Sequence, residues 1–281
     1  MKPYYDDDRS TIYHGDAADV IASLPDASVD CVVTSPPYAE QRKSTYGGIP
    51  EADYPAWTVG WMEPLKRVLK PRGSVIINIR PHVKGGAISD YTLRMRLALR
   101  GAGWTEVEEL VWFKKGGGPP VGHVERPRRS WESLHWFGLS GDVWCDTRGN
   151  GVPSDAIGGL RTGRAARIGW DHLHGAQNGV SSGISRSLDV ASIPQGGHGQ
   201  ADDVDHPAPY PPKIAAWCIR LVCPPGGTVL DPFSGSGSTG VAAIQEGRRY
   251  VGIDVMEEYA AMSARRVANE PHTLDIFGGV A

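Results

Sequence analysis

Apolar positions along the chain follow two patterns, which predict two kinds of secondary structure. Short apolar runs are typical of buried strands, and apolar residues spaced three and four apart are typical of helices. We predict strands over residues 11–14, 29–34, 107–113, 133–137 and 250–254, and helices over residues 53–69, 89–100, 212–221, 238–246 and 257–268. Because strands alternate with helices of this length, the fold class is α/β, with a mostly parallel sheet covered by helices on both faces.

Two stretches resemble each other and support this alternation. Residues 67–79 have the sequence RVLKPRGSVIINI, and residues 220–232 have the sequence RLVCPPGGTVLDP. Each predicts the end of a helix, a turn of proline and glycine, and then a short apolar strand. Half of a strand–helix–strand unit is therefore expected near each end of the chain.

The middle of the chain has a different composition. From residue 116 to residue 205 it is rich in Gly, Ser, Asp and Arg and has few periodic segments. Loops of this length inside a domain are usually functional or disordered. We predict a catalytic half over residues 1–115, an insertion over 116–205 whose first part completes the sheet, and a second half over 206–281. A flexible linker in place of the insertion is the alternative.

Composition limits the classes of protein that the chain can belong to. Its 281 residues include 40% hydrophobic and 22% charged residues, and its formal net charge is −3. This charge argues against a globally basic nucleic-acid binder, although it leaves room for a local basic face. The four cysteines form no metal-binding spacing, and no apolar run has the length of a membrane span. We expect a soluble, cytoplasmic protein without a metal.

A glycine-rich turn follows the predicted strand at residue 228. The sequence TVLDPFSGSGSTG over residues 228–240 predicts a strand, a tight turn and the start of a helix, which lets backbone approach a ligand closely. Asp254 ends the next strand, at a suitable distance to bind a ribose diol. A phosphate-binding P-loop is excluded because no lysine follows the glycines. A nicotinamide site, an S-adenosylmethionine site with Asp231 near the amino-acid end, and a purely structural turn remain open.

The sequence TSPPY at residues 34–38 leaves a predicted strand through two prolines. The prolines fix the backbone and lack N–H groups, so the corner is stiff and rich in acceptors. An exocyclic amine of a nucleobase is a poor nucleophile, because its lone pair is delocalised into the ring. The Ser35 hydroxyl and the Pro36 carbonyl could accept both amine hydrogens while Tyr38 stacks on the base. The alternative is a proline-stiffened turn in which Tyr38 only packs.

The two motifs together resemble those of the DNA amino-methyltransferases, which methylate cytosine N4 or adenine N6 with S-adenosylmethionine. The family pattern is [D/N/S]-P-P-[Y/F] with a D-P-F-x-G-S-G loop, and here the corner precedes the loop, as in the circularly permuted β group. The resemblance covers roughly residues 10–115 and 205–270. It implies a Rossmann-like, seven-stranded sheet, an inserted target-recognition region and a base rotated out of double-stranded DNA.

The resemblance also implies roles for particular residues. The catalytic corner is Ser35, Pro36, Pro37 and Tyr38. Asp16, in the sequence HGDA, is expected near the cofactor adenine, and His206 begins the segment before the helix that closes over the methionine end. The cofactor-binding residues implied are Asp16, Ala17, Thr34, His206, Asp231, Pro232, Phe233, Ser234, Gly235, Ser236, Gly237 and Asp254.

Basic residues near the corner and in the insertion are candidates for holding DNA. Phosphate contacts need Lys or Arg, and arginine can also recognise guanine. The DNA-binding candidates are Arg42, Lys43, Lys114, Lys115, Arg126, Arg128 and Arg129.

These features together predict a site-specific DNA methyltransferase. Serine at the first position of the corner favours cytosine N4 within the family, with adenine N6 as the alternative. Methylation of RNA or of a protein amide, a nicotinamide oxidoreductase and a non-enzymatic DNA-binding protein explain fewer of the motifs. A cognate restriction endonuclease is a candidate partner, and the expected state is a monomer or a homodimer.

Overall fold

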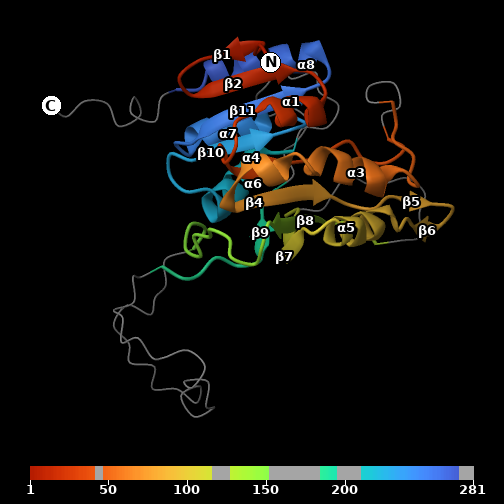
Figure 1. The fold of residues 1–281 in the computed structure, drawn as a ribbon. Coiled ribbons are helices and arrows are strands. Elements are labelled where there is room, and N and C mark those ends of the chain that lie inside the picture. Colours follow the sequence, from red (N-terminus) through yellow and green to blue (C-terminus); the bar gives the residue numbers. More distant parts are fainter. Residues whose placement is uncertain (42–46, 116–126, 152–183, 195–209, 272–281) are drawn as a thin grey trace, which may run out of the picture.

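The computed structural model describes residues 1–41, 47–115, 127–151, 184–194 and 210–271. These residues form a nine-stranded sheet with helices on both faces and a separate two-stranded hairpin (Figure 1). The sheet strands are β1 (Tyr5–Asp6), β2 (Ser10–His14), β3 (Val29–Thr34), β4 (Leu69–Ile79), β7 (Thr105–Phe113), β8 (Trp131–Gly138), β9 (Val190–Ser192), β10 (Thr228–Asp231) and β11 (Arg249–Asp254). The hairpin pairs β5 (Val83–Lys84) with β6 (Ala87–Ile88).

The strand order in the sheet is β1-β2-β11-β10-β3-β4-β8-β7-β9. The five strands from β2 to β4 pair in parallel, and β8 lies antiparallel between β4 and β7. The predicted mostly parallel sheet is confirmed. It exceeds the seven strands implied by the resemblance because β1 and β9, of two and three residues, extend its two edges.

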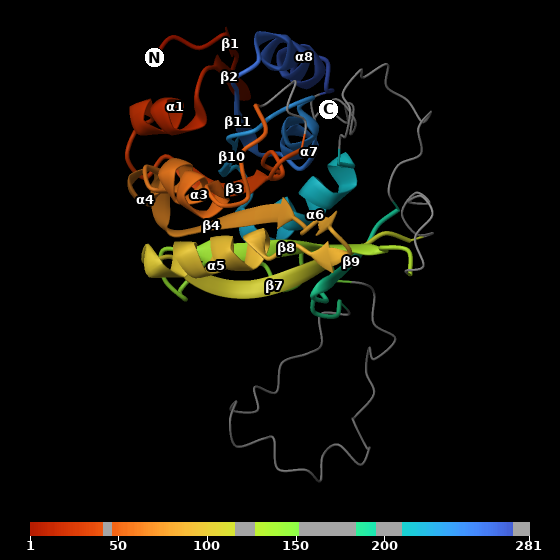
Figure 2. The same ribbon diagram turned by 90° about the vertical axis from the view of Figure 1, so that its right-hand side faces the viewer.

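Helices cover both faces of the sheet, as Figure 2 shows. One layer contains α1 (Ala17–Ser23), α3 (Tyr54–Met62), α4 (Leu65–Val68) and α5 (Tyr91–Gly101), and the other contains α6 (Pro212–Val222), α7 (Ser238–Gln245) and α8 (Glu257–Ala268). Successive strand side chains point to opposite faces. In β3, Cys31 and Val33 therefore pack in the core with α6 to α8, whereas Val32 packs in the core with α1 to α5.

Two predicted elements differ in the structure. The helix expected over 53–69 divides into α3 and α4 at Pro64, whose missing N–H interrupts helical hydrogen bonding. The proline-glycine turn expected after residue 69 lies inside β4 as an irregularity: Val29 pairs with Leu69, but Cys31 pairs with Ser74. The second similar stretch follows its prediction, because α6 ends at Val222 and β10 begins at Thr228.

The parallel strands place their carboxyl ends along one edge of the sheet. Thr34, Asp231 and Asp254 are the last residues of β3, β10 and β11, which are neighbours in the order β11-β10-β3. Ligands of open α/β sheets bind in the crevice at this edge. Among the described residues, no helix has the length and apolar character needed to cross a membrane.

Candidate active site

The Ser-Pro-Pro-Tyr corner leaves β3 at the carboxyl edge and is held on both sides. Thr34, just before it, donates its hydroxyl to Asp231 Oδ1 at 2.6 Å. Tyr54 of α3 donates its hydroxyl to the Pro37 carbonyl at 2.9 Å. Pro36 is buried, whereas Ser35 and Pro37 are partly exposed. The corner is therefore held on both sides, and its serine is partly exposed.

Tyr38 points its hydroxyl toward a carboxylate on a different strand. The hydroxyl donates to Glu132 Oε2 of β8 at 3.4 Å. Burial and the negative charge of Glu132 raise the pKa of Tyr38 well above its ordinary value, and a hydrogen bond with the Ser35 side chain partly offsets this rise. Tyr38 is therefore a neutral phenol connected to both Ser35 and Glu132.

Asp231 joins three elements rather than facing the crevice. Its side chain is 1% exposed, and it accepts Thr34 Oγ1 on Oδ1 and Thr239 Oγ1 of α7 on Oδ2, each at 2.6 Å. Burial raises the pKa of Asp231 to about 6, and the hydrogen bonds from Thr239 and Thr34 oppose this rise. The sequence placed this carboxylate at the amino-acid end of a cofactor. The structure uses both of its oxygens to connect β3, β10 and α7.

The glycine-rich turn between β10 and α7 presents backbone, not serine side chains. Gly237 has φ +82°, and a Cβ there would lie 2.9 Å from Ser263 Cα, so only glycine fits this turn closely. Ser234 bonds Ser263 and Tyr250, each at 2.8 Å. Ser236 accepts Arg266 Nη1 at 2.7 Å on its carbonyl and at 3.2 Å on its side-chain hydroxyl. The two serines are thus directed toward α8 and β11.

Asp254 at the end of β11 holds the glycine turn in place. Its Oδ2 accepts the Gly235 N–H at 2.8 Å, and its Oδ1 accepts the Met256 N–H at 2.9 Å. Burial raises the pKa of Asp254 to about 6, which these two backbone N–H groups partly offset. Each carboxylate oxygen retains a lone pair for a ligand hydroxyl.

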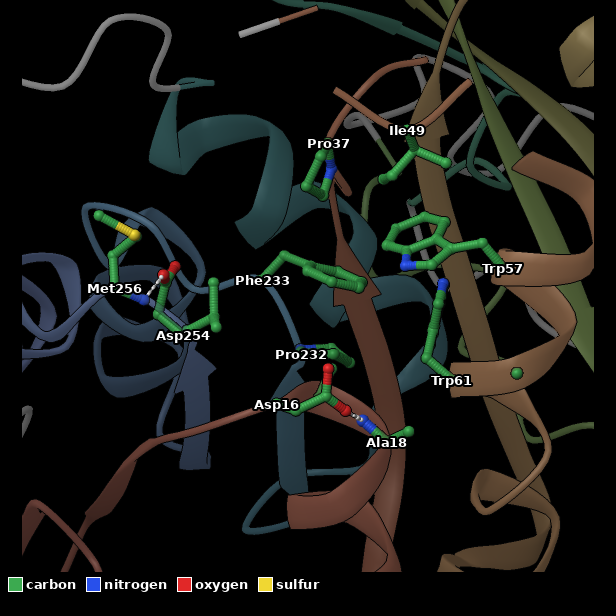
Figure 3. Close-up of a pocket in the computed structure, with 13 residues that line it drawn as sticks. Asp16, Ala18, Pro37, Ile49, Trp57, Trp61, Pro232, Phe233, Asp254 and Met256 are labelled. Atoms are coloured by element: carbon green, nitrogen blue, oxygen red, sulfur yellow. Dashed lines mark hydrogen bonds between the residues drawn. The ribbon is translucent and has the colours of Figure 1, made fainter. Parts of the chain in front are cut away.

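A pocket of about 530 Å³ brings the two sequence motifs together. It is lined by Asp16, Ala17, Ala18, Pro37, Ile49, Trp57, Gly60, Trp61, Pro232, Phe233, Asp254, Val255 and Met256. Figure 3 shows Pro37 of the corner across the pocket from Asp16, with Asp254 and Met256 on one side and Trp57 and Trp61 on the other. Pro37 of the corner, Pro232 and Phe233 at the start of the glycine-rich turn, and both acidic residues therefore surround one space.

The aromatic wall of this pocket is the main feature that the sequence did not predict. The Phe233 ring lies 5.4 Å from that of Trp57 and 5.2 Å from that of Trp61, between ring centroids. The available signal was the spacing of the two tryptophans, four residues apart on one helix. Asp16 was predicted, but its second role was not: it caps α1 by accepting the Ala18 N–H at 2.8 Å.

The side chains that line the pocket fit an S-adenosyl nucleoside. Asp254 supplies a carboxylate suited to ribose hydroxyls, Asp16 supplies an acceptor suited to an adenine amine, and the apolar and aromatic walls suit a purine ring. The Pro37 side of the pocket places the corner next to such a ligand. Among the residues that the structure describes, no lysine or arginine lines the pocket, which disfavours a pyrophosphate-containing dinucleotide.

The candidates for DNA binding differ in their exposure. Lys115 and Arg128 are exposed, and Arg129 is partly buried and donates to the Pro81 carbonyl. Lys114 differs from the prediction: it is 3% exposed, and its Nζ lies 2.5 Å from Glu132 Oε1, so it is not presented to a phosphate. The remaining candidates, Arg42, Lys43 and Arg126, together with His206 of the cofactor set, lie outside the described residues.

Within the described part of the chain, one group of side chains has metal-binding geometry. Glu40, Glu51 and His82 each offer a ligand atom within 4.8 Å of the others. His82 is already paired with Glu51 at 2.6 Å, and Glu40 with Lys84 at 2.8 Å. The expectation of no metal stays a prediction.

Comparisons with known proteins identify the fold and the family of the chain. The fold is that of an α/β methyltransferase: the PvuII DNA methyltransferase, described as cytosine-N4-specific, superposes with a TM-score of 0.72 at 24% identity, over 95% of this chain and 89% of its own. M1.HpyAVI, solved with S-adenosylmethionine, superposes with a TM-score of 0.55 at 18% identity, over 92% of this chain and 99% of its own. The profile of the DNA methylase family named for N6 and N4 methylation matches residues 29–265, and the chain belongs to this family.

Curated relatives extend over most of the chain. Type II methyltransferase M.PvuII of Proteus hauseri is 28% identical over 94% of this chain and 85% of its own. Type II methyltransferase M.XycI of Xanthomonas campestris pv. cyanopsidis is 30% identical over 93% of this chain and 88% of its own. The resemblance found in the sequence is confirmed, and the chain is a DNA methyltransferase of the N4/N6 type.

Proposed function

We propose that the chain transfers a methyl group from S-adenosylmethionine to N4 of a cytosine rotated out of duplex DNA. The observation that carries this proposal is that Pro37 of the corner lines the same pocket as Asp16 and Asp254. A methyl donor bound through these two carboxylates would lie next to the residues suited to gripping an amine. S-adenosylmethionine supplies an electrophilic methyl group, and the chain supplies the orientation.

The corner would act by aligning the amine. The Ser35 hydroxyl and the Pro36 carbonyl accept its two hydrogens, which shifts electron density onto the nitrogen and favours pyramidal geometry. Thr34 and Tyr54 hold the corner through bonds of 2.6 and 2.9 Å, so these acceptors need little reorganisation when the base arrives. Tyr38 offers its ring to the base.

Cytosine is favoured by two observations. The corner begins with serine, which in this family favours cytosine. The chain is also 28% identical to M.PvuII over most of its length, and the PvuII methyltransferase is described as cytosine-N4-specific. Adenine N6 is the second candidate, because a serine hydroxyl can accept from either amine and the family includes both activities.

The other assignments belong to the same proposal. Lys115, Arg128 and the candidates outside the described residues would contact DNA, and residues 116–205 would carry target recognition. His206 would close the cofactor site, and Asp231 would act through Thr34 rather than on the cofactor. A cognate restriction endonuclease, a monomeric or dimeric state and a cytoplasmic location stay predictions.

The test uses methyl-labelled S-adenosylmethionine and mixed-sequence duplex DNA. After digestion to nucleosides, the labelled species is identified by mass. We expect label in N4-methyl-2′-deoxycytidine. Label in N6-methyl-2′-deoxyadenosine would replace the first candidate by the second, and label only in RNA or in protein offered in parallel would refute both.

A further inference from the structure

Methylation of an exocyclic amine releases a proton. If the chain has the proposed function, its site must accept that proton. The nitrogen carries two hydrogens before it attacks and must carry one afterwards. A carboxylate at the first position of the corner could take that proton, but this chain has Ser35 there. A neutral hydroxyl can accept a proton only while it passes on its own.

Glu132 lies where such a proton could end. It is 6% exposed, and it is the second residue of β8, the strand that pairs with β4. Its Oε1 faces Lys114 Nζ at 2.5 Å and Arg80 Nε at 3.5 Å. Its other oxygen, Oε2, accepts the Tyr38 hydroxyl at 3.4 Å. The cations thus occupy one oxygen, and the corner occupies the other.

Tyr38 completes the connection. Its hydroxyl donates to Glu132, and Ser35, three residues earlier in the same corner, lowers the pKa of Tyr38, so Tyr38 connects the corner to a buried carboxylate. A phenol that remains protonated can donate one proton and accept another in the same event. The 3.4 Å separation is longer than an ideal O–H···O bond, as is common before a substrate tightens a site.

A purely structural ion pair explains this arrangement less well. A buried pair contributes little net stability, because desolvation offsets its attraction. Lys114 alone satisfies the pairing requirement of the carboxylate, yet Glu132 also contacts Tyr38, a residue of the catalytic corner. The Tyr38–Glu132 hydrogen bond therefore connects the Lys114–Glu132 ion pair to the corner that is proposed to hold the amine.

We propose that Glu132 accepts, through Tyr38 and Ser35, the proton that the target amine loses on methylation. The amine nitrogen forms its bond to the methyl carbon as the methyl–sulfur bond breaks. One amine proton passes to Ser35 Oγ, the Ser35 proton passes to the Tyr38 oxygen, and the Tyr38 proton passes to Glu132 Oε2. Glu132 returns this proton to solvent between turnovers.

The charges balance in this step. The positive charge of the sulfonium disappears as the thioether forms, and the negative charge of Glu132 disappears as it takes the proton. The net charge of the reacting groups is therefore conserved. While Glu132 holds the proton, Lys114 lacks its counter-charge, and this favours the return of the proton to solvent. Glu132 touches no reacting atom and is a positioning residue that acts through Tyr38.

The experiment measures single-turnover methylation of duplex DNA and the Kd for S-adenosylmethionine in parallel. The variants are Tyr38→Phe, which keeps the ring, Glu132→Gln and the two combined. Glu108→Gln on the exposed side of β7 is the matched control. We expect each single variant to lower the rate by about 10- to 100-fold with an unchanged Kd. The double variant should be no slower than the slower single, because both break one chain.

Two additions separate proton transfer from support of the fold. Glu132→Gln leaves Lys114 without its counter-charge, so Glu132→Gln/Lys114→Met is measured as a neutral pair with thermal unfolding as the check. In Glu132→Ala, chloroacetate, formate and acetate should restore the rate in increasing order of basicity. Rescue without that order, no rescue, or an undiminished rate in Tyr38→Phe would overturn the relay. A wild-type protein that methylates no DNA would instead refute the proposed function.

Discussion

Asp254 combines a structural and a ligand-binding role in one carboxylate. It holds Gly235 and Met256 through their N–H groups and also lines the pocket. Burial of the charged Asp254 carboxylate reduces the stability of the fold, and ligand binding gives a reason for its position. Because an unfolded aspartate titrates near pH 4 and Asp254 titrates near 6, the folded protein binds more protons between these values. The contribution of Asp254 to the free energy of unfolding therefore falls as the pH rises from about 4 to about 6.

Cofactor affinity should show the opposite dependence on pH. An ionised carboxylate accepts hydroxyl donors more strongly than a protonated one. We therefore predict that the Kd for S-adenosylmethionine rises several-fold as the pH falls through about 6, measured by calorimetry. The isosteric variant Asp254→Asn should bind weakly at every pH and lose the transition. A wild-type Kd that does not change with pH, or the same transition in the variant, would contradict this role.

At the scale of elements, the connection between β3, β10 and α7 depends on Asp231. Thr34 and Asp231 are the last residues of neighbouring parallel strands, and Thr239 lies in the first turn of α7. The carboxylate thus sets the position of the residue directly before Ser35.

Thr34→Val should therefore destabilise the protein more than an ordinary loss of a hydroxyl. It removes the shorter of the two hydrogen bonds to Oδ1 of the buried Asp231 carboxylate, which keeps only the Phe233 N–H at 3.1 Å, at a cost of about 1–3 kcal/mol. Urea unfolding measures the difference. Thr11→Val is the matched control, because the hydrogen bond that Thr11 of β2 donates to Asp6 is exposed. Equal effects of the two substitutions would argue against the connection.

The sequence predicted elements better than it predicted their partners. The strand over 29–34 and the helix over 257–268 have their predicted bounds, because apolar period and flanking residues are local. The division of the helix at Pro64 could have been predicted from the proline itself, but the apolar pattern continued across it. Lys114 could not be placed, since its burial depends on Glu132 across two strands. The aromatic wall depends likewise on Trp57 meeting Phe233, which is distant in sequence.

At the scale of the whole molecule, a net charge of −3 must be reconciled with binding to DNA. Lys115 follows β7 and Arg128 precedes β8, so both lie toward one edge of the sheet, whereas β1 forms the opposite edge. A local basic face at the β7–β8 edge would attract DNA despite the overall charge.

This placement predicts a difference between two lysines. Lys115→Ala should weaken binding to duplex DNA and reduce the slope of log K against log salt by about 1, because one phosphate contact is lost. Lys2→Ala, at an exposed position beside the β1 edge, should change neither quantity. Fluorescence anisotropy over a salt series measures both. Equal slopes in the two variants would place the DNA elsewhere.

The central claim is that the corner performs the chemistry while Asp16 and Asp254 bind the methyl donor. The most direct test is Ser35→Ala, measured as single-turnover methylation of duplex DNA together with the Kd for S-adenosylmethionine. Loss of one aligned acceptor should lower the rate by about 100-fold or more and leave the Kd within about threefold of wild type. A weakened Kd with an unchanged rate would contradict the account, because it would place Ser35 in the cofactor site instead of at the amine.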